Sequence, residues 1–207
     1  MTALSSPVLP LHRAIVAVDV EGSTTRTNPA KAQLRHNMYD VLESALRECG
    51  IVEQHRDELV DRGDGVLVLV HPVDHLPKTL LLNVFIPALI QLVADHNAHQ
   101  PNHWFRLRSA VHAGEVHFDR RGAFGEAIDI TCRLLDAPEL KVQLRQTTAP
   151  LVLVVSDDIY RSLVRHRYDG IDDRDFEPMV HVEVAGNPHR GWVYVPPAPF
   201  TTVRATA

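Results

Sequence analysis

Two aspartates occupy similar places, each beside a short apolar segment that indicates a buried strand. Asp19 lies near the end of segment 13–20 (RAIVAVDV), and Asp64 lies in the glycine turn just before segment 65–70 (GVLVLV). Two carboxylates held close together repel each other unless a cation bridges them. Their hard oxygens suit Mg²⁺ or Mn²⁺, which keep open positions for phosphate. The spacing therefore allows a metal site, and the alternative is that both aspartates only cap turns.

The elements that position these aspartates follow from apolar periodicity. A polar turn (EGSTT) ends the first strand, and a helix then begins with Asn28 as N-cap and Pro29 at its first position, and it ends before Gly50. Further along the chain we expect strands at 51–52 and 65–70, a helix at 76–97, two short strands within 105–117 joined by a turn at Ala113 and Gly114, a loop at 122–125, a helix at 126–145, a strand at 151–155, a helix capped by Ser156, and a hairpin of 180–184 with 191–195.

Composition limits the classes of protein. The chain has 207 residues, of which 45% are hydrophobic and 23% charged, which predicts one α/β domain with alternating strands and helices. A net charge of −5 gives no basic surface for nucleic acid. Segment 79–94 is too short and too polar for a membrane span, so we expect a core helix and no membrane. Two cysteines and no export signal predict a cytoplasmic protein.

Five segments resemble the signatures of class III nucleotidyl (adenylate/guanylate) cyclases. They occur in the order of that family and span residues 13–195: VDVEGST, RGDG, RLRSAVHAGEV, GEAIDITCRLLD and VVSDDIYRSL. The resemblance implies an α/β (α+β) fold with a ferredoxin-like βαββαβ core and extra C-terminal strands. It also implies an N-terminal extension (1–12), a nucleotidyl cyclase-like domain (13–196) and a tail (197–207).

The resemblance also implies a metal and phosphate site. Asp19 and Asp64 would bind two Mg²⁺ or Mn²⁺ ions per active site, with the main-chain carbonyl of Val20 as a further ligand. The turn that follows would bind phosphate groups through backbone N–H groups. That turn contains Gly22, Ser23 and Thr24.

A second set of residues would complete the site from another subunit. Arg133 matches the arginine that stabilises the transition state in the family, and Asp129 stands where the family has an asparagine that orients the ribose. Aspartate can accept a hydrogen bond from a sugar hydroxyl but cannot donate one. The implied assembly is a head-to-tail homodimer with shared active sites. The alternative for Arg133 is a surface ion pair with Asp129, four residues earlier on the helix.

Three positions depart from the family. Val60 replaces the purine-selecting lysine, Gly122 replaces a polar base contact, and Ala185 replaces a lysine that binds the triphosphate. Apolar side chains cannot supply the hydrogen bonds that select a purine. Arg62 and Arg190 are the neighbouring cations that we expect at the nucleotide.

We therefore expect a cyclase that converts a nucleoside triphosphate to a 3′,5′-cyclic nucleotide and pyrophosphate. A pyrimidine substrate would resemble the bacterial cCMP and cUMP cyclases of anti-phage signalling. The alternative is an inactive homologue that acts as a nucleotide-binding or protein-interaction module. The sequence contains no G-x-S-x-G and no Walker motif. The thirteen histidines form no zinc ligand set with a familiar spacing, so we expect solvated histidines, including His112.

Overall fold

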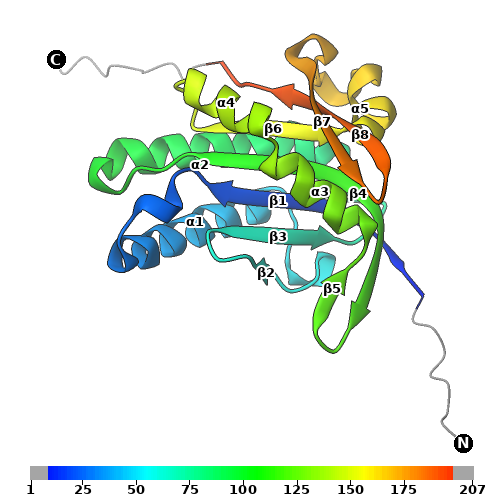
Figure 1. Ribbon diagram of the computed structural model, residues 1–207, viewed down its shortest axis with the longest axis horizontal. Coiled ribbons are helices and arrows are strands. Elements are labelled where there is room, and N and C mark those ends of the chain that lie inside the picture. Colours follow the sequence, from blue (N-terminus) through cyan, green and yellow to red (C-terminus); the bar gives the residue numbers. More distant parts are fainter. Residues whose placement is uncertain (1–8, 198–207) are drawn as a thin grey trace, which may run out of the picture.

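The computed structural model describes residues 9–197, which form one mixed sheet with helices on both faces (Figure 1). The strands are β1 (Leu11–Val20), β2 (Val60–Asp61), β3 (Gly65–Val70), β4 (Leu107–Asp119), β5 (Gly122–Phe124), β6 (Leu151–Ser156), β7 (Phe176–Val184) and β8 (Asn187–Tyr194). The α-helices are α1 (Asn28–Glu48), α2 (Ile86–His99), α3 (Glu126–Asp136), α4 (Pro138–Gln146) and α5 (Asp157–Ser162).

The order of the strands confirms the predicted ferredoxin-like core. Elements β1, α1, β2, β3, α2 and β4 follow one another along the chain, and their strands lie in the order β2-β3-β1-β4 with every neighbouring pair antiparallel. Strand β6 then pairs in parallel with β4, and β8 and β7 extend the sheet beyond it. These last strands are the predicted C-terminal additions.

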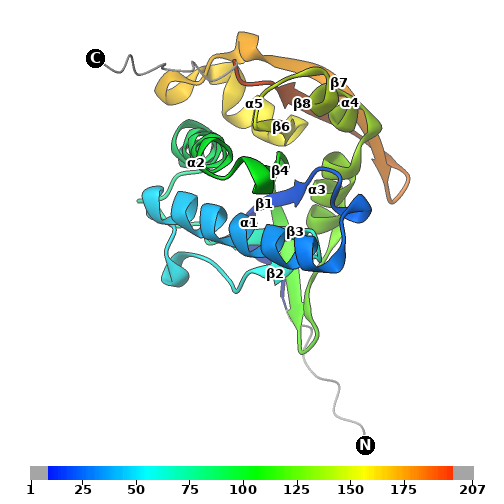
Figure 2. The same cartoon turned by 90° about the vertical axis from the view of Figure 1, so that its left-hand side faces the viewer.

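The alternation of side chains along β1 separates two apolar layers. Val16 and Val18 are buried against α1 and α2, whereas Ile15 and Ala17 are buried against α3 and α4. Figure 2 shows α1 and α2 on one side of the strands and α3 on the other. Because Asp19 continues the Ile15 and Ala17 side, its carboxylate lies on the face covered by α3.

Helix α2 is the predicted core helix. A π-helical turn, Leu81–Phe85, precedes it, and together they form a helix long and apolar enough to span a membrane, with a mean hydropathy of 1.2. Phe85, Leu89 and Val93 are fully buried in the layer that contains α1. One face of this helix is thus used in packing within the domain.

Two predicted element boundaries were wrong. Strand pairing explains the first and the conformation before Pro138 explains the second. Strand β4 runs straight through Ala113 and Gly114, because these residues pair with β1 across an unbroken antiparallel ladder. The helix predicted at 126–145 is two helices, since Ala137 takes an extended ψ of 133° before Pro138 begins α4.

Smaller corrections concern caps, loops and one histidine. The N-cap of α1 is Thr27, one residue before the predicted Asn28. Residues 51–52 form no strand, whereas 122–124, predicted as loop, form β5. His112 is buried, where solvent was expected. Its Nδ1 lies 2.8 Å from Oγ of Ser156, which caps α5 as predicted, and burial lowers the pKa of the imidazole to about 4.

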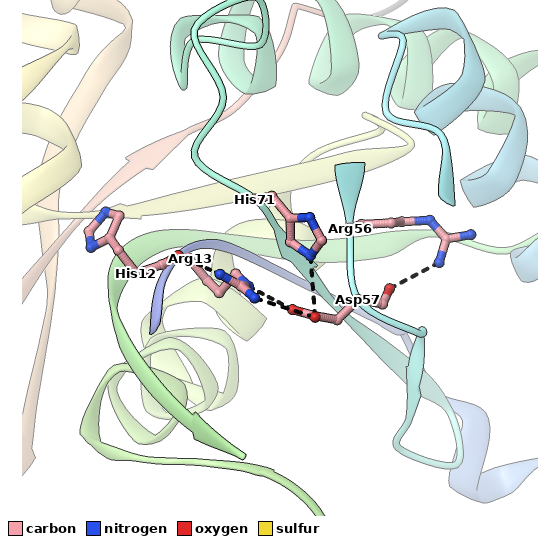
Figure 3. Close-up of polar contacts among 5 residues, drawn as sticks. All are labelled: His12, Arg13, Arg56, Asp57 and His71. Carbon is pink, nitrogen blue, oxygen red and sulfur yellow. Dashed lines mark hydrogen bonds and ion pairs between the residues drawn. The ribbon is translucent and has the colours of Figure 1, made fainter. Parts of the chain in front are cut away.

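The start of β1 is tied to the long connection that leads to β2. Arg13 donates from Nε to Oδ2 of Asp57 at 2.7 Å, and Nε2 of His71 lies 3.2 Å from Oδ1 of the same carboxylate (Figure 3). The Arg13 side chain is 10% exposed and that of Asp57 is 26% exposed. This ion pair anchors the connection at the end of β1 opposite to Asp19.

Candidate active site

Asp19 and Asp64 lie side by side because β1 and β3 approach closely. Asp19 pairs with Gly65 in the antiparallel register, and the N–H of Val20 donates to the main-chain oxygen of Asp64 at 3.0 Å. A Cβ atom at position 65 would collide with the carbonyl oxygen of Val18. Glycine at this position therefore allows the strand approach that brings the main chains of Asp19 and Asp64 together.

The Asp19 carboxylate is bound by an arginine that the sequence analysis did not select. Arg108 on β4 donates from Nε to Oδ1 at 2.8 Å and from Nη2 to Oδ2 at 2.6 Å. The Asp19 side chain is 14% exposed. Burial raises the pKa of Asp19 above its usual value and the negative charge of Asp64 adds to the rise, while the Arg108 guanidinium opposes it.

The turn after β1 lies beside Asp64. Gly22 has a φ of 66°, in the left-handed region that favours glycine, and a 3₁₀ turn, Ser23–Thr25, follows. Ser23 is buried and its hydroxyl donates to the Asp64 carboxylate. Thr24 lies on the surface next to it. Of the predicted metal ligands, Asp64 thus contacts the predicted phosphate turn directly.

A cavity of about 490 Å³ opens at this group. It is lined by Val20, Ser23, Thr24 and Asp64 together with Lys31 and Arg35 from the first turns of α1. Lys31 and Arg35, four residues apart, place two cations on the same side of the helix. Sequence reasoning missed both, although their spacing directly after the phosphate turn was a usable signal.

A second cavity, of about 460 Å³, collects the other predicted residues. Arg62, Asp129, Arg133 and Ala185 line it, together with neighbours on α3 and the β7–β8 hairpin. Asp129 and Arg133 are exposed, one helical turn apart. Among residues 9–197 the two side chains form no ion pair with each other, so the surface ion pair considered as an alternative is not made.

The remaining predicted positions, including Asp19 and Gly22, line neither cavity. Arg190 is exposed on β8 opposite His181, and Gly122 pairs with Asp119 in the β4–β5 hairpin. Val60 on β2 is partly buried against the apolar layer that contains α3. A valine at this position contributes to packing and offers a nucleobase no hydrogen bond.

The donor set fits hard divalent cations. The Asp19 and Asp64 carboxylates and the Val20 main-chain oxygen are oxygen ligands, as Mg²⁺ and Mn²⁺ prefer. Within the described part of the chain no three His, Cys, Asp or Glu side chains group as metal ligands, so protein carboxylates would supply only part of a coordination shell. Such incomplete coordination suits ions that also bind phosphate oxygens.

Solved structures share this fold at low sequence identity. A crystal structure of an adenylate/guanylate cyclase/hydrolase from Silicibacter pomeroyi aligns with 91% of this chain and 98% of its own, at a TM-score of 0.61 and 19% identity. The guanylyl cyclase Cya2 aligns with 93% of this chain and 96% of its own, at a TM-score of 0.60 and 14% identity.

A third structure was determined with a nucleotide. The guanylate cyclase domain of RhGC from Catenaria anguillulae, in complex with GTP, aligns with 89% of this chain and 96% of its own, at a TM-score of 0.60 and 12% identity. No protein-family model and no curated protein matches the sequence. Together, the strand order and these structures show that residues 9–197 have the fold of class III adenylate and guanylate cyclase catalytic domains.

Proposed function

We propose that this protein is a nucleotidyl cyclase, which converts a nucleoside triphosphate to a 3′,5′-cyclic nucleotide and pyrophosphate. One observation carries the proposal: Asp19 and Asp64 meet at adjacent strand ends beside the turn at 22–24. Carboxylates next to the backbone N–H groups of a glycine turn suit a metal-bound triphosphate. The fold shared with adenylate and guanylate cyclases supports the same reaction class.

Each group of residues would have one task. Asp19, Asp64 and the Val20 carbonyl would hold Mg²⁺ or Mn²⁺, which when bound lowers the pKa of the ribose 3′-hydroxyl and stabilises the leaving pyrophosphate. Arg133 would neutralise the charge that grows on the α-phosphate. Asp129 would accept a hydrogen bond from a ribose hydroxyl.

The two cavities support a shared site. Asp64 and Val20 line one cavity together with Ser23 and Thr24 of the phosphate turn, and Arg133 with Asp129 lines another. A head-to-tail homodimer would place the first cavity of one subunit against the second cavity of its partner, and a two-fold axis would create two such sites. We infer that the active form is this dimer.

The residues at the positions that select a purine or bind the triphosphate in the cyclase family favour a pyrimidine substrate. Val60 is packed in the apolar layer, and Ala185 offers no side-chain hydrogen bond in the second cavity. Selection of adenine or guanine by polar partners is worth about 10⁴–10⁵ where such partners exist. The cyclic product would act in signalling, and a pyrimidine product would favour an anti-phage role.

Incubation of the purified protein with ATP, GTP, CTP and UTP in Mn²⁺ tests the activity. We expect one cyclic nucleotide and equimolar pyrophosphate, detected by mass spectrometry, with CTP or UTP preferred in direct competition. No cyclic product from any of the four, at a concentration at which the protein is dimeric, would refute the cyclase. A clear preference for ATP would refute the base assignment alone.

Mixing two inactive variants tests the shared site. Asp64→Ala removes a metal ligand and Arg133→Ala removes the arginine, so each alone loses activity. Random mixing restores one intact site in each heterodimer, and about a quarter of the wild-type activity should return. Failure of the mixture to exceed either variant, although heterodimers form, would contradict the shared site.

A non-catalytic nucleotide-binding module is the second candidate. The absence of polar side chains at Val60 and Ala185 favours it, since these positions would hold a substrate in an active enzyme. Titration with a triphosphate separates the two functions. Metal-dependent binding without any cyclic product would support the module, whereas product formation would exclude it.

A further inference from the structure

We propose that Arg108 is an internal counter-cation that occupies Asp19, so that a divalent metal must displace its guanidinium in order to bind. The proposal rests on the proposed function, because it concerns the same pair of aspartates. Both carboxylate oxygens of Asp19 accept hydrogen bonds from Arg108, at 2.8 Å and 2.6 Å. The guanidinium occupies one lone pair of each oxygen and its positive charge repels a cation, so a metal ion that binds this carboxylate competes with the arginine.

The contact is built into the sheet. Asp19 and Arg108 are directly opposed in the antiparallel register of β1 and β4, so their side chains emerge on the same face. Their side chains are 14% and 12% exposed. A bidentate, largely buried pair is strong, and a guanidinium that loses its partner there is costly.

The two aspartates are unequal as ligands. The Asp64 carboxylate accepts a hydrogen bond from Ser23 and, among residues 9–197, forms no ion pair. Asp64 is thus free to coordinate a cation, while Asp19 becomes free only when Arg108 moves. If the released state is about one-tenth populated, the apparent metal affinity is about tenfold weaker than the intrinsic one.

Mn²⁺ titration without nucleotide tests the proposal, with calorimetry or electron paramagnetic resonance as the readout. Arg108→Gln removes the competing charge and should bind Mn²⁺ about tenfold more tightly than the wild type. Mn²⁺ should also raise the melting temperature of Arg108→Gln by more than it raises that of the wild type. The double variant Arg108→Gln with Asp64→Asn should lose this gain in Mn²⁺ affinity. Such a loss would show that the additional Mn²⁺ binding occurs at the two aspartates.

Arg106 provides a matched control. It forms a similar partly buried ion pair, with Nη2 2.7 Å from the Glu21 carboxylate, two residues from Arg108 along the chain. Arg106→Gln removes the same charge and frees a carboxylate beside the site. It should bind Mn²⁺ as the wild type does, and a gain equal to that of Arg108→Gln would overturn the specific role of Arg108.

Unchanged or weaker Mn²⁺ binding by folded Arg108→Gln would refute the proposal. If that variant does not fold, Arg108→Lys decides, since its single ammonium cannot hold both oxygens and its affinity should lie above that of the wild type; an unchanged affinity would refute the proposal. The cyclase assay remains independent. Cyclic product with no change in metal affinity would overturn only the counter-cation, and improved metal binding without product would overturn only the enzyme.

Discussion

The two ends of β1 carry the same kind of ion pair with opposite electrostatic outcomes. At the start of the strand, Arg13 binds Asp57, and at its end Asp19 is bound by Arg108. Burial by itself favours a higher pKa for both carboxyl groups. For Asp57, hydrogen bonds from Arg13 and His71 outweigh burial and the pKa falls below its usual value. For Asp19, burial prevails and the pKa is raised.

The difference comes first from the deeper burial of Asp19 and then from the third group at each end. His71 adds a hydrogen bond to Asp57, whereas Asp64 adds a second negative charge near Asp19. Asp57 is also more exposed, at 26% against 14% for Asp19. An arginine–carboxylate pair is therefore structural where its surroundings stabilise the negative charge. Where they do not, the arginine stabilises the carboxylate less completely, and a divalent cation can compete with it.

Removing the two carboxylates should affect activity very differently. Asp19→Ala should lower cyclic nucleotide formation by about 10²–10³-fold or more, because it deletes a preorganised electrostatic group at the reacting phosphates. Asp57→Ala, at the other end of the strand, should leave the rate of the folded protein within about twofold. Initial rates at saturating Mn²⁺ measure both. Equal losses of activity in the two folded variants would show that Asp19 has no greater role in the reaction than Asp57.

The ion pair at the start of β1 should matter for stability and not for the reaction rate. Arg13→Gln leaves Asp57 with only His71, and the free energy of unfolding should fall by about 1.5–3 kcal/mol, the range for hydrogen bonds to charged groups. Urea denaturation measures the change. A destabilisation of less than about 0.5 kcal/mol, the level typical of surface changes, would show that the pair does not anchor the connection to β2.

The pH dependence of this contribution has a defined sign. Because the pKa of Asp57 is lower in the folded protein than its ordinary value of 3.8, its stabilisation is present above that value. It is lost as the pH falls through the folded pKa. The difference in unfolding free energy between the wild type and Asp57→Asn should thus shrink as the pH falls below about pH 4. A difference that grows as the pH falls from about 4 to about 2 would contradict the assignment.

An exposed ion pair provides the smallest effect. Lys141 Nζ lies 3.2 Å from the Asp136 carboxylate, and the two side chains are 35% and 66% exposed. Lys141→Ala should change the unfolding free energy by less than about 1 kcal/mol, since water and salt screen such pairs. The same urea experiment measures it. A loss as large as that of Arg13→Gln would show that burial is not what separates these pairs.

The local features followed from the sequence because they depend on neighbours along the chain. Apolar alternation and periodicity located β1, β3 and α1, and ordered motifs indicated the ferredoxin-like core and the turn at 22–24. The split between α3 and α4 at Pro138 and the continuity of β4 through Gly114 were missed. In the first case an apolar helical pattern continues past a proline. In the second a glycine suggests a turn within a strand pattern, and pairing with β1 keeps that strand continuous.

Only the tertiary structure decided the partners of the candidate site. The adjacency of Asp19 and Asp64 needs the close approach of β1 and β3 at Gly65, and Arg108 reaches Asp19 through a strand register that joins residues 89 positions apart. Sequence patterns identify which residue types can bind a cation. Which charge faces which carboxylate depends on contacts between distant segments, and these exist only after the sheet has formed.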